Sequence, residues 1–394
     1  MNHDPPVRWV DRALKPVYET TAKESTVYVS LTPEHAALRS SIRRFFDTES
    51  PIEAARGFVE SDKNYEPRVW ARMARELGLQ GLLVPERYDG ADATFVEMAI
   101  TLEEMGRQLV CSPFFSSAVL ATEALLTSGD SAAMSRYLSD IAAGTTIATL
   151  AVDLSRDLSD LTVAATMTDT GYELNGHIRF VVDIMSSDLM LVPANTATGI
   201  SLFAVSVAGA GLIRSPHTVL DGTRPMGSVD LDRTPGELVG SEGHAAIALR
   251  TTLDAAAIAL AAEQLGGAQA CLDMAVGYAK SRAAFGRPIG SFQAIKHKCA
   301  DMFLAIEAAR NTVYHAARTL AEGEGASIPF QAAACRKVAS DAFLLAASQN
   351  IQIHGGIGFT WEHDAHLYLK RARATRELLG SPAHHLARVA DQMI

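Results

Sequence analysis

Apolar residues follow two different periods along the chain, and the change of period divides the sequence into three parts. After Thr32-Pro33, a pair typical of a helix start, apolar residues recur at helical spacing as far as Phe45. The same spacing predicts amphipathic helices over 69–77 and 95–109. The first part, 31–144, is therefore predicted to be a helical domain.

The second part, 145–242, has the period of two that is typical of strands. Residues 172–180 and 200–207 are rich in strand-forming side chains. Asn175-Gly176 is expected to form a hairpin turn, because both residues tolerate a positive φ. These features predict a small β domain between two helical regions.

The third part, 243–394, is helical again. Alanine dominates 253–270, and Gly266-Gly267 lies inside that run. Side chains this small allow helix axes to approach closely, which is typical of a bundle. Further long helices are expected over 292–322 and 329–353.

Composition and charge exclude several classes of protein. The 394 residues are 48% hydrophobic and 20% charged, as in a globular protein with a large core. A net charge of −10 leaves no excess of cations to neutralise phosphates, which argues against a nucleic-acid partner. Four widely spaced cysteines indicate reduced thiols and a cytoplasmic location. Residues 1–30 are expected to be an N-terminal extension without a signal peptide, and no apolar run reaches the roughly 20 residues of a membrane span.

Two segments of the third part carry the most specific pattern in the chain. Residues 282–294 read Arg-Ala-Ala-Phe-Gly-Arg-Pro-Ile-Gly-Ser-Phe-Gln-Ala, and residues 352–358 read Gln-Ile-His-Gly-Gly-Ile-Gly. Together they resemble the flavin-holding half of the acyl-CoA dehydrogenase family, and residues 31–394 follow the family's domain order. The resemblance implies a mainly α fold with a central β domain. Its parts would be an N-terminal helical domain, a small β-barrel or sandwich, and a C-terminal four-helix bundle.

The resemblance also implies a cofactor and partners. Members of the family dehydrogenate the α,β-bond of an acyl-CoA thioester with FAD that is stretched between subunits of a tetramer, and an electron-transfer acceptor takes the electrons. A permanently charged guanidinium suits phosphate oxygens, and glycine lets the backbone approach a cofactor. The residues that match the family's FAD contacts are Arg282, Phe285, Gln293, Gln352, Gly355 and Gly356.

The resemblance fails where the family places its chemistry. The catalytic glutamate, which removes the α-proton, occupies one of two usual positions, and here these hold Leu379 and Ala256. The loop that lies beside the flavin ring in the family matches 152–158 without its threonine, proline and glycine. The strand that backs the ring matches 180–182, where Val182 offers no hydroxyl. This chain's own pocket for the flavin ring is therefore in question.

Other side chains are candidate substitutes. Glu263 lies seven residues after Ala256 on the same helix face, about 10 Å along the axis, and a glutamate in so apolar a helix is expected to need a partner such as arginine. It is a candidate for a relocated base, and a buried structural hydrogen bond is its alternative. Glu377 lies two residues before Leu379, but in a helix it would point elsewhere. His363 and His366 share a helical spacing, but no third ligand is evident, so no metal is expected. His384-His385 is expected to lie at the surface.

Four hypotheses remain open at this point. The leading one is a subunit that lacks the catalytic base and completes the FAD site of a glutamate-bearing homologous partner, as in some actinobacterial heteromeric tetramers that act on bulky acyl-CoA thioesters such as steroid side chains. The segment Leu378 to Pro382 resembles that subunit type. The others are a self-sufficient homomeric dehydrogenase, a scaffold without flavin, and a flavin monooxygenase on the same fold.

Overall fold

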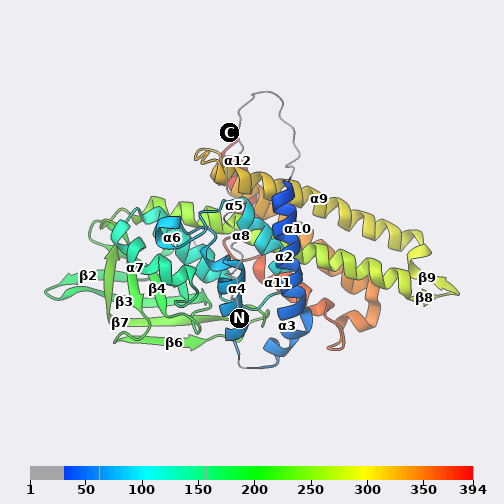
Figure 1. Ribbon diagram of the computed structural model, residues 1–394, viewed down its shortest axis with the longest axis horizontal. Helices are drawn as coiled ribbons and strands as arrows, with labels where there is room; N and C mark the ends of the chain where they lie inside the picture. The colour runs from blue at the N-terminus through cyan, green and yellow to red at the C-terminus, as the bar shows by residue number, and fades with distance from the viewer. Residues whose placement is uncertain (1–30, 62, 156–157, 394) are drawn as a thin grey trace, which may run out of the picture.

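The computed structural model describes residues 31–61, 63–155 and 158–393, so the expected N-terminal extension lies outside the described residues. The first part of the described chain is helical, and its helices lie across the middle of Figure 1 and over the strands at its left. They are α2 (Pro33–Glu49), α3 (Ile52–Val59), α4 (Pro67–Leu77), α5 (Phe95–Arg107), the π-helical segment η3 (Phe115–Ala121), α6 (Thr122–Ser128) and α7 (Ser131–Ala142).

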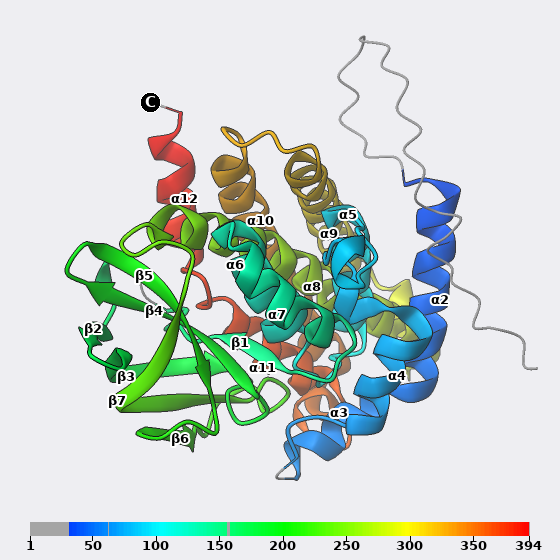
Figure 2. The same cartoon turned by 60° about the vertical axis from the view of Figure 1, so that its left-hand side comes forward.

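Seven strands follow and form one sheet that closes on itself. They are β1 (Ala148–Leu150), β2 (Ala164–Thr168), β3 (Gly171–Val182), β4 (Leu189–Thr196), β5 (Gly199–Ser206), β6 (Leu212–Pro216) and β7 (Met226–Val239). The order is β1-β4-β2-β3-β7-β5, β6 pairs with β7, and the additional pairing of β4 with β5 closes the sheet around its own apolar cluster. Figure 2 shows this barrel-like unit packed against the helices.

The predicted hairpin turn at Asn175-Gly176 is wrong. Strand β3 runs through both residues, and the turn between β2 and β3 lies at Asp169-Thr170. At Asn175 the pairing of β3 with β7 shifts its register, and the Asn175 side chain accepts a bond of 2.8 Å from the Arg233 amide. A Cβ on Gly176 would lie 2.6 Å from the carbonyl oxygen of Thr162, so this glycine serves a close backbone approach rather than a turn.

The C-terminal part is a bundle of long helices. Its elements are α8 (Ala245–Ser281), the small hairpin β8 (Ala283–Ala284) and β9 (Arg287–Pro288), η5 (Ile289–Ser291), α9 (Gln293–Ala321), α10 (Ile328–His354), η6 (Gly355–Phe359), α11 (Ala365–Thr375) and α12 (Pro382–Asp391). Helix α8 is long and apolar enough to cross a membrane by composition, but 67% of its most apolar window is buried within the protein. It is therefore the core helix of the fold, and it runs through the centre of Figure 1.

Helices α5 and α8 cross at two glycines. A Cβ on Gly266 would lie 1.8 Å from the Glu103 carbonyl oxygen, and a Cβ on Gly106 would lie 1.9 Å from the Glu263 carbonyl oxygen. These distances leave no room for a methyl group on either side. The expectation of close helix packing around Gly266 is thus confirmed, and this contact fixes Glu103 and Glu263 on opposite sides of the crossing.

The crossing predicts a large stability difference between two glycines of α8. Gly266→Ala is expected to lower the free energy of unfolding by at least about 1–3 kcal/mol, because the helices must separate. Gly277→Ala is the matched control, because an added Cβ there meets no atom within 4 Å. It is expected to stabilise the helix by about 0.5–1 kcal/mol. Urea unfolding of both variants checks this, and equal stabilities would contradict a tight crossing.

Candidate functional site

A buried network of charges lies where the barrel meets the bundle. Glu263 on α8 accepts hydrogen bonds from Arg224, which precedes β7, and from Arg371 on α11. The Arg371 Nη1 atom lies 2.7 Å from the Glu263 Oε1 atom. Arg371 also donates to the carboxylate of Asp221 and to the Thr223 carbonyl. All of these residues are at most 8% exposed, so the charges compensate one another out of contact with water.

Glu263 is therefore held as a carboxylate with both oxygens occupied. Burial alone would raise its pKa, but Arg224 and Arg371 outweigh burial and hold the pKa below its ordinary value. A carboxylate with a lowered pKa and two guanidinium partners is a weak proton acceptor. The geometry thus favours a structural link between three segments, while the candidacy of Glu263 as a base stays a prediction.

A second buried carboxyl group, Asp183, was not predicted from the sequence. It is 4% exposed, has a positive φ of 55°, and accepts a bond of 2.8 Å from the Ser116 hydroxyl. Burial raises the pKa of Asp183 to about 6, although Arg224 and Arg371 act in the opposite direction. In the sequence it is only a polar residue at the end of a predicted strand, so no local signal distinguishes it.

The structure brings the six predicted FAD contacts to one end of the bundle. Arg282 and Phe285 lie on the hairpin that follows α8, and Gln293 begins α9. Gln352 and the glycine turn at 355–356 end α10, which meets the end of α8 through the stacked rings of Tyr278 and His354, 4.2 Å apart. The hairpin β8-β9 projects at the far right of Figure 1. Segments 60 residues apart in the sequence thus share one surface.

These six residues are exposed in the single chain. Phe285 is 94% exposed, which is unusual for so large an apolar side chain. Within the described residues, Arg282 makes no ion pair, and open space lies above Gly355 and Gly356. A free guanidinium, two amide side chains and bare glycine backbone are suited to the diphosphate and adenosine of a dinucleotide that another surface supports. The residues present therefore fit the outer part of FAD.

The two usual base positions hold apolar residues in closed surroundings. Ala256 is fully buried in α8. Leu379 has a φ of 59°, and its amide donates a bond of 2.7 Å to the Leu154 carbonyl, in the segment that matches the family's flavin-ring loop. Buried Arg336 holds the same turn, since it donates to the carbonyls of Thr375 and Leu378. The two segments that flank the ring and thioester in the family are thus in direct contact here.

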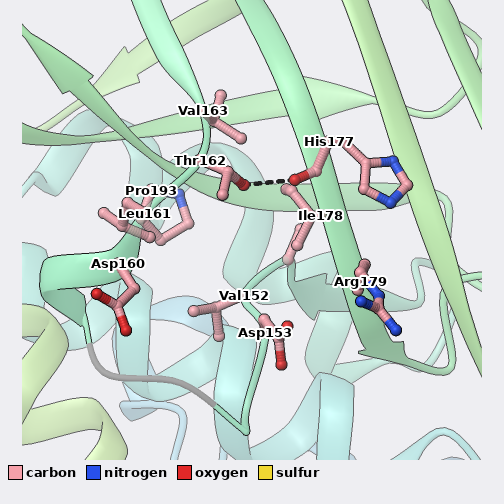
Figure 3. A pocket seen from close by; sticks show the side chains of 11 residues that line it. Val152, Asp153, Asp160, Leu161, Thr162, Val163, His177, Ile178, Arg179 and Pro193 are labelled. Carbon is pink, nitrogen blue, oxygen red and sulfur yellow. Dashed lines mark hydrogen bonds between the residues drawn. The ribbon is translucent and has the colours of Figure 1, made fainter.

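A pocket of about 280 Å³ opens on the barrel beside this contact (Figure 3). Its walls are apolar and include Val152 and Ile178, whereas Asp153, Asp160 and Arg179 bring charges to its sides. Val182 is buried and its carbonyl accepts a bond from Thr149. Positions 156 and 157 of the ring-loop segment lie outside the described residues. Among the described side chains, Asp153 and Asp160 thus make the lining of this pocket partly acidic.

The histidines near the C-terminus differ in their exposure and in the rings that they contact. His363 precedes α11, and its ring meets that of His354 at an angle of 46°, while His366 lies inside α11 against Trp361. Among the described residues, no group of three potential metal ligands occurs. His384 is exposed as expected, but His385 is only 1% exposed, so that expectation is wrong for His385. It faces the core because α12 packs that side of its helix on α10.

The buried network predicts a stability defect for Glu263→Gln. The change leaves Arg224 and Arg371 buried with one anionic partner fewer, which is expected to cost about 3–5 kcal/mol. The exposed Glu377→Gln is the control and is expected to stay within about 0.5 kcal/mol of the parent. Because the pKa of Glu263 is lowered in the fold, its contribution is present above pH about 4.3 and is lost as pH falls through its folded pKa. A variant of normal stability that loses only turnover would instead identify Glu263 as a base.

Asp183 predicts the opposite pH dependence. Its raised pKa means that the folded protein holds a proton that the unfolded chain releases between pH about 3.9 and 6, so this group lowers stability as pH rises through that window. Asp183→Asn mimics the protonated form and is expected to raise the free energy of unfolding at pH 7.5 by about 1–3 kcal/mol. Asparagine also tolerates a positive φ. Denaturant unfolding at pH 4.5 and 7.5 measures the change, and a loss of stability at pH 7.5 would contradict a raised pKa of Asp183.

Comparison with known proteins agrees with this geometry. The model for the C-terminal domain of acyl-CoA dehydrogenases matches residues 245–394, and the model for their N-terminal domain matches residues 32–145. The chain is 34% identical to acyl-CoA dehydrogenase IpdE2 of Mycobacterium tuberculosis over 369 residues, covering 92% of this chain and 99% of the relative.

Two solved complexes have the same fold. A variant of the Tcur3481-Tcur3483 steroid ACAD superposes with a TM-score of 0.83 at 28% identity over 91% of this chain and 97% of that one. The ChsE4-ChsE5 complex of Mycobacterium tuberculosis superposes with a TM-score of 0.84 at 25% identity over 92% and 98%. The expected mainly helical fold with a central β region is confirmed. The chain therefore belongs to the acyl-CoA dehydrogenase family, whose members are FAD-dependent oxidoreductases that act on CH–CH bonds.

Proposed function

We propose that this chain is the base-lacking subunit of a heteromeric acyl-CoA dehydrogenase and that it completes the FAD site of a glutamate-bearing homologous partner. When bound, FAD supplies the hydride acceptor for oxidation at the β-carbon, and the partner's carboxylate takes the α-proton. This chain contributes binding groups to the outer part of the cofactor. Electrons then pass to an electron-transfer acceptor, and the complex works in the cytoplasm.

The proposal rests on the contrast between an exposed surface at the end of the bundle and a closed seam between barrel and bundle. At the end of the bundle, Arg282 and the glycine turn are exposed, and the Arg282 guanidinium makes no ion pair with the described residues. At the seam between barrel and bundle, Leu379 is hydrogen-bonded to Leu154 and no usual position offers a base. The first surface supports a role in binding a dinucleotide, and the second supports the assignment of proton abstraction to another chain.

The relatives support a two-component assembly. The two solved structures named above are each named for a pair of proteins, Tcur3481-Tcur3483 and ChsE4-ChsE5, and the first is called a steroid ACAD. By analogy with them, we assign a bulky acyl-CoA thioester as the substrate of the complex. A homomeric enzyme that uses Glu263 is less well supported, because both oxygens of Glu263 are occupied by arginines.

Co-expression with a glutamate-bearing homologue tests the proposal. We expect the two chains to co-purify with bound FAD and to oxidise an acyl-CoA, whereas this chain alone is expected to be inactive. Arg282→Ala in the complex is expected to weaken FAD binding about 10–100-fold, since a charge-assisted hydrogen bond contributes about 1.5–3 kcal/mol. Fluorescence titration of the apo-complex with FAD measures the affinity.

Arg250→Ala is the matched control, because Arg250 is also an exposed arginine of the α8 segment but lies far from the hairpin. It is expected to leave FAD affinity unchanged. Robust dehydrogenase activity of this chain alone would overturn the assignment, and equal FAD affinity in the two arginine variants would remove Arg282 from the site.

A further inference from the structure

Beneath the glycine turn, three rings from two distant segments form a column. The ring of Tyr278, near the end of α8, stacks on His354 with centroids 4.2 Å apart and an interplanar angle of 29°. His354 in turn meets His363, with centroids 4.3 Å apart. His354 is the last residue of α10, and Gly355 follows it with a φ of 64°. The direction in which the chain leaves α10 therefore depends on how His354 is held.

We propose that this column, Tyr278-His354-His363, positions the glycine turn for the adenosine end of FAD, and that protonation of its imidazoles releases the turn. The inference rests on the proposed function and extends it to a control of cofactor binding. The column adjoins the turn through His354, which directly precedes Gly355, whereas the cofactor would lie on the open side of Gly355 and Gly356. His354 and His363 are thus positioning residues rather than ligands.

Hydrogen bonds specify the neutral form of each imidazole. The Nδ1 atom of His354 lies 2.9 Å from the Asn350 carbonyl oxygen, so it carries the proton and donates. The Nδ1 atom of His363 accepts a bond of 3.1 Å from the Ala365 amide at the start of α11, so it is unprotonated. A proton added to His363 at Nδ1 would place two donors face to face and break that bond. Protonation of His363 would therefore weaken the start of α11 as well as the column.

The surroundings provide little compensation for added positive charge. From α11, Lys370 lies over the Trp361 ring, which meets His366, and the Nε2 atom of His366 is buried without a partner among the described residues. The nearby carboxylate of Asp364 is already paired with Arg56 of α3 at 2.5 Å. Glu362 is exposed, and Tyr278 from α8 offers only a neutral ring. Two cations in this stack would therefore repel each other.

The sign of the pH effect follows from burial. Burial lowers the pKa of His354, His363 and His366, so all three are neutral at pH 7 in the folded protein. The unfolded chain binds these protons at pH about 6.5. The stability of the column is thus fully present above pH about 6.5 and is lost as pH falls through 6.5 towards the lower folded pKa values.

The main experiment measures FAD affinity of the co-purified complex between pH 5.5 and 7.5. The parent complex is expected to bind FAD about tenfold more weakly at pH 5.5, equivalent to about 1.4 kcal/mol. His363→Phe keeps a ring in the stack, and His363→Asn keeps an acceptor for the Ala365 amide. Position 363 does not titrate in either variant, so both are expected to lose most of the pH dependence. His315→Phe, at an exposed histidine of α9, is the control and is expected to behave like the parent.

A second readout needs no cofactor. Trp361 meets His366 with ring centroids 4.6 Å apart, and a protonated imidazole quenches indole emission, so Trp361 fluorescence is expected to fall below pH 6.5. Trp361→Phe removes this signal and serves as its control. FAD affinity that is independent of pH in the parent, or equally pH-dependent in both His363 variants, would overturn the inference. A complex that binds no FAD at any pH would overturn the proposed function, and the fluorescence transition would then still report whether His366, three residues after His363, is protonated in this pH range.

Discussion

The buried charges around Glu263 fix how the barrel and the bundle meet. Three segments that are far apart in the sequence supply the members of this network, Glu263, Arg224, Arg371 and Asp221. All four are buried, so water does little to screen their charges. Such a network adds little net stability over apolar packing, but its loss is costly once any member is removed. It therefore specifies one arrangement of the seam. That seam is where acyl-CoA dehydrogenases place their flavin ring, so its geometry bears directly on function.

Helix α8 connects the buried network to the exposed hairpin at the end of the bundle. Glu263 lies near its middle, and Arg282 follows its last residue, about 28 Å along the axis. The glycine crossing with α5 and the contact of Gly267 with the Phe343 ring hold the helix in place without space for adjustment. The exposed hairpin is consequently presented at a defined position. A rigid helix is what a subunit needs if it is to offer binding groups to a cofactor held by another chain.

The seam and the bundle end present different kinds of surface. At the seam, the turn around Leu379 is bonded to the barrel and held by Arg336, whose own pKa burial lowers to about 10. At the bundle end, polar and glycine positions stay open, and stacked rings support them from beneath. This contrast agrees with the proposed role as a base-lacking subunit, because a chain that works with a partner needs only part of the site.

The sequence by itself determined the elements and the candidate binding surface. Helical and strand periods are local properties, and the motifs around Arg282 and Gly355 belong to contiguous segments. Only the tertiary structure decided which groups are buried and what they meet. Glu263 pairs with Arg224, 39 residues away, and with Arg371, 108 residues away. Burial by distant segments raises the pKa of Asp183, and Asn175-Gly176 stays in a strand because β7 pairs with it. Turn propensity is a weak local preference. Desolvation and strand pairing depend on residues that are distant in the sequence and become neighbours only in the folded chain.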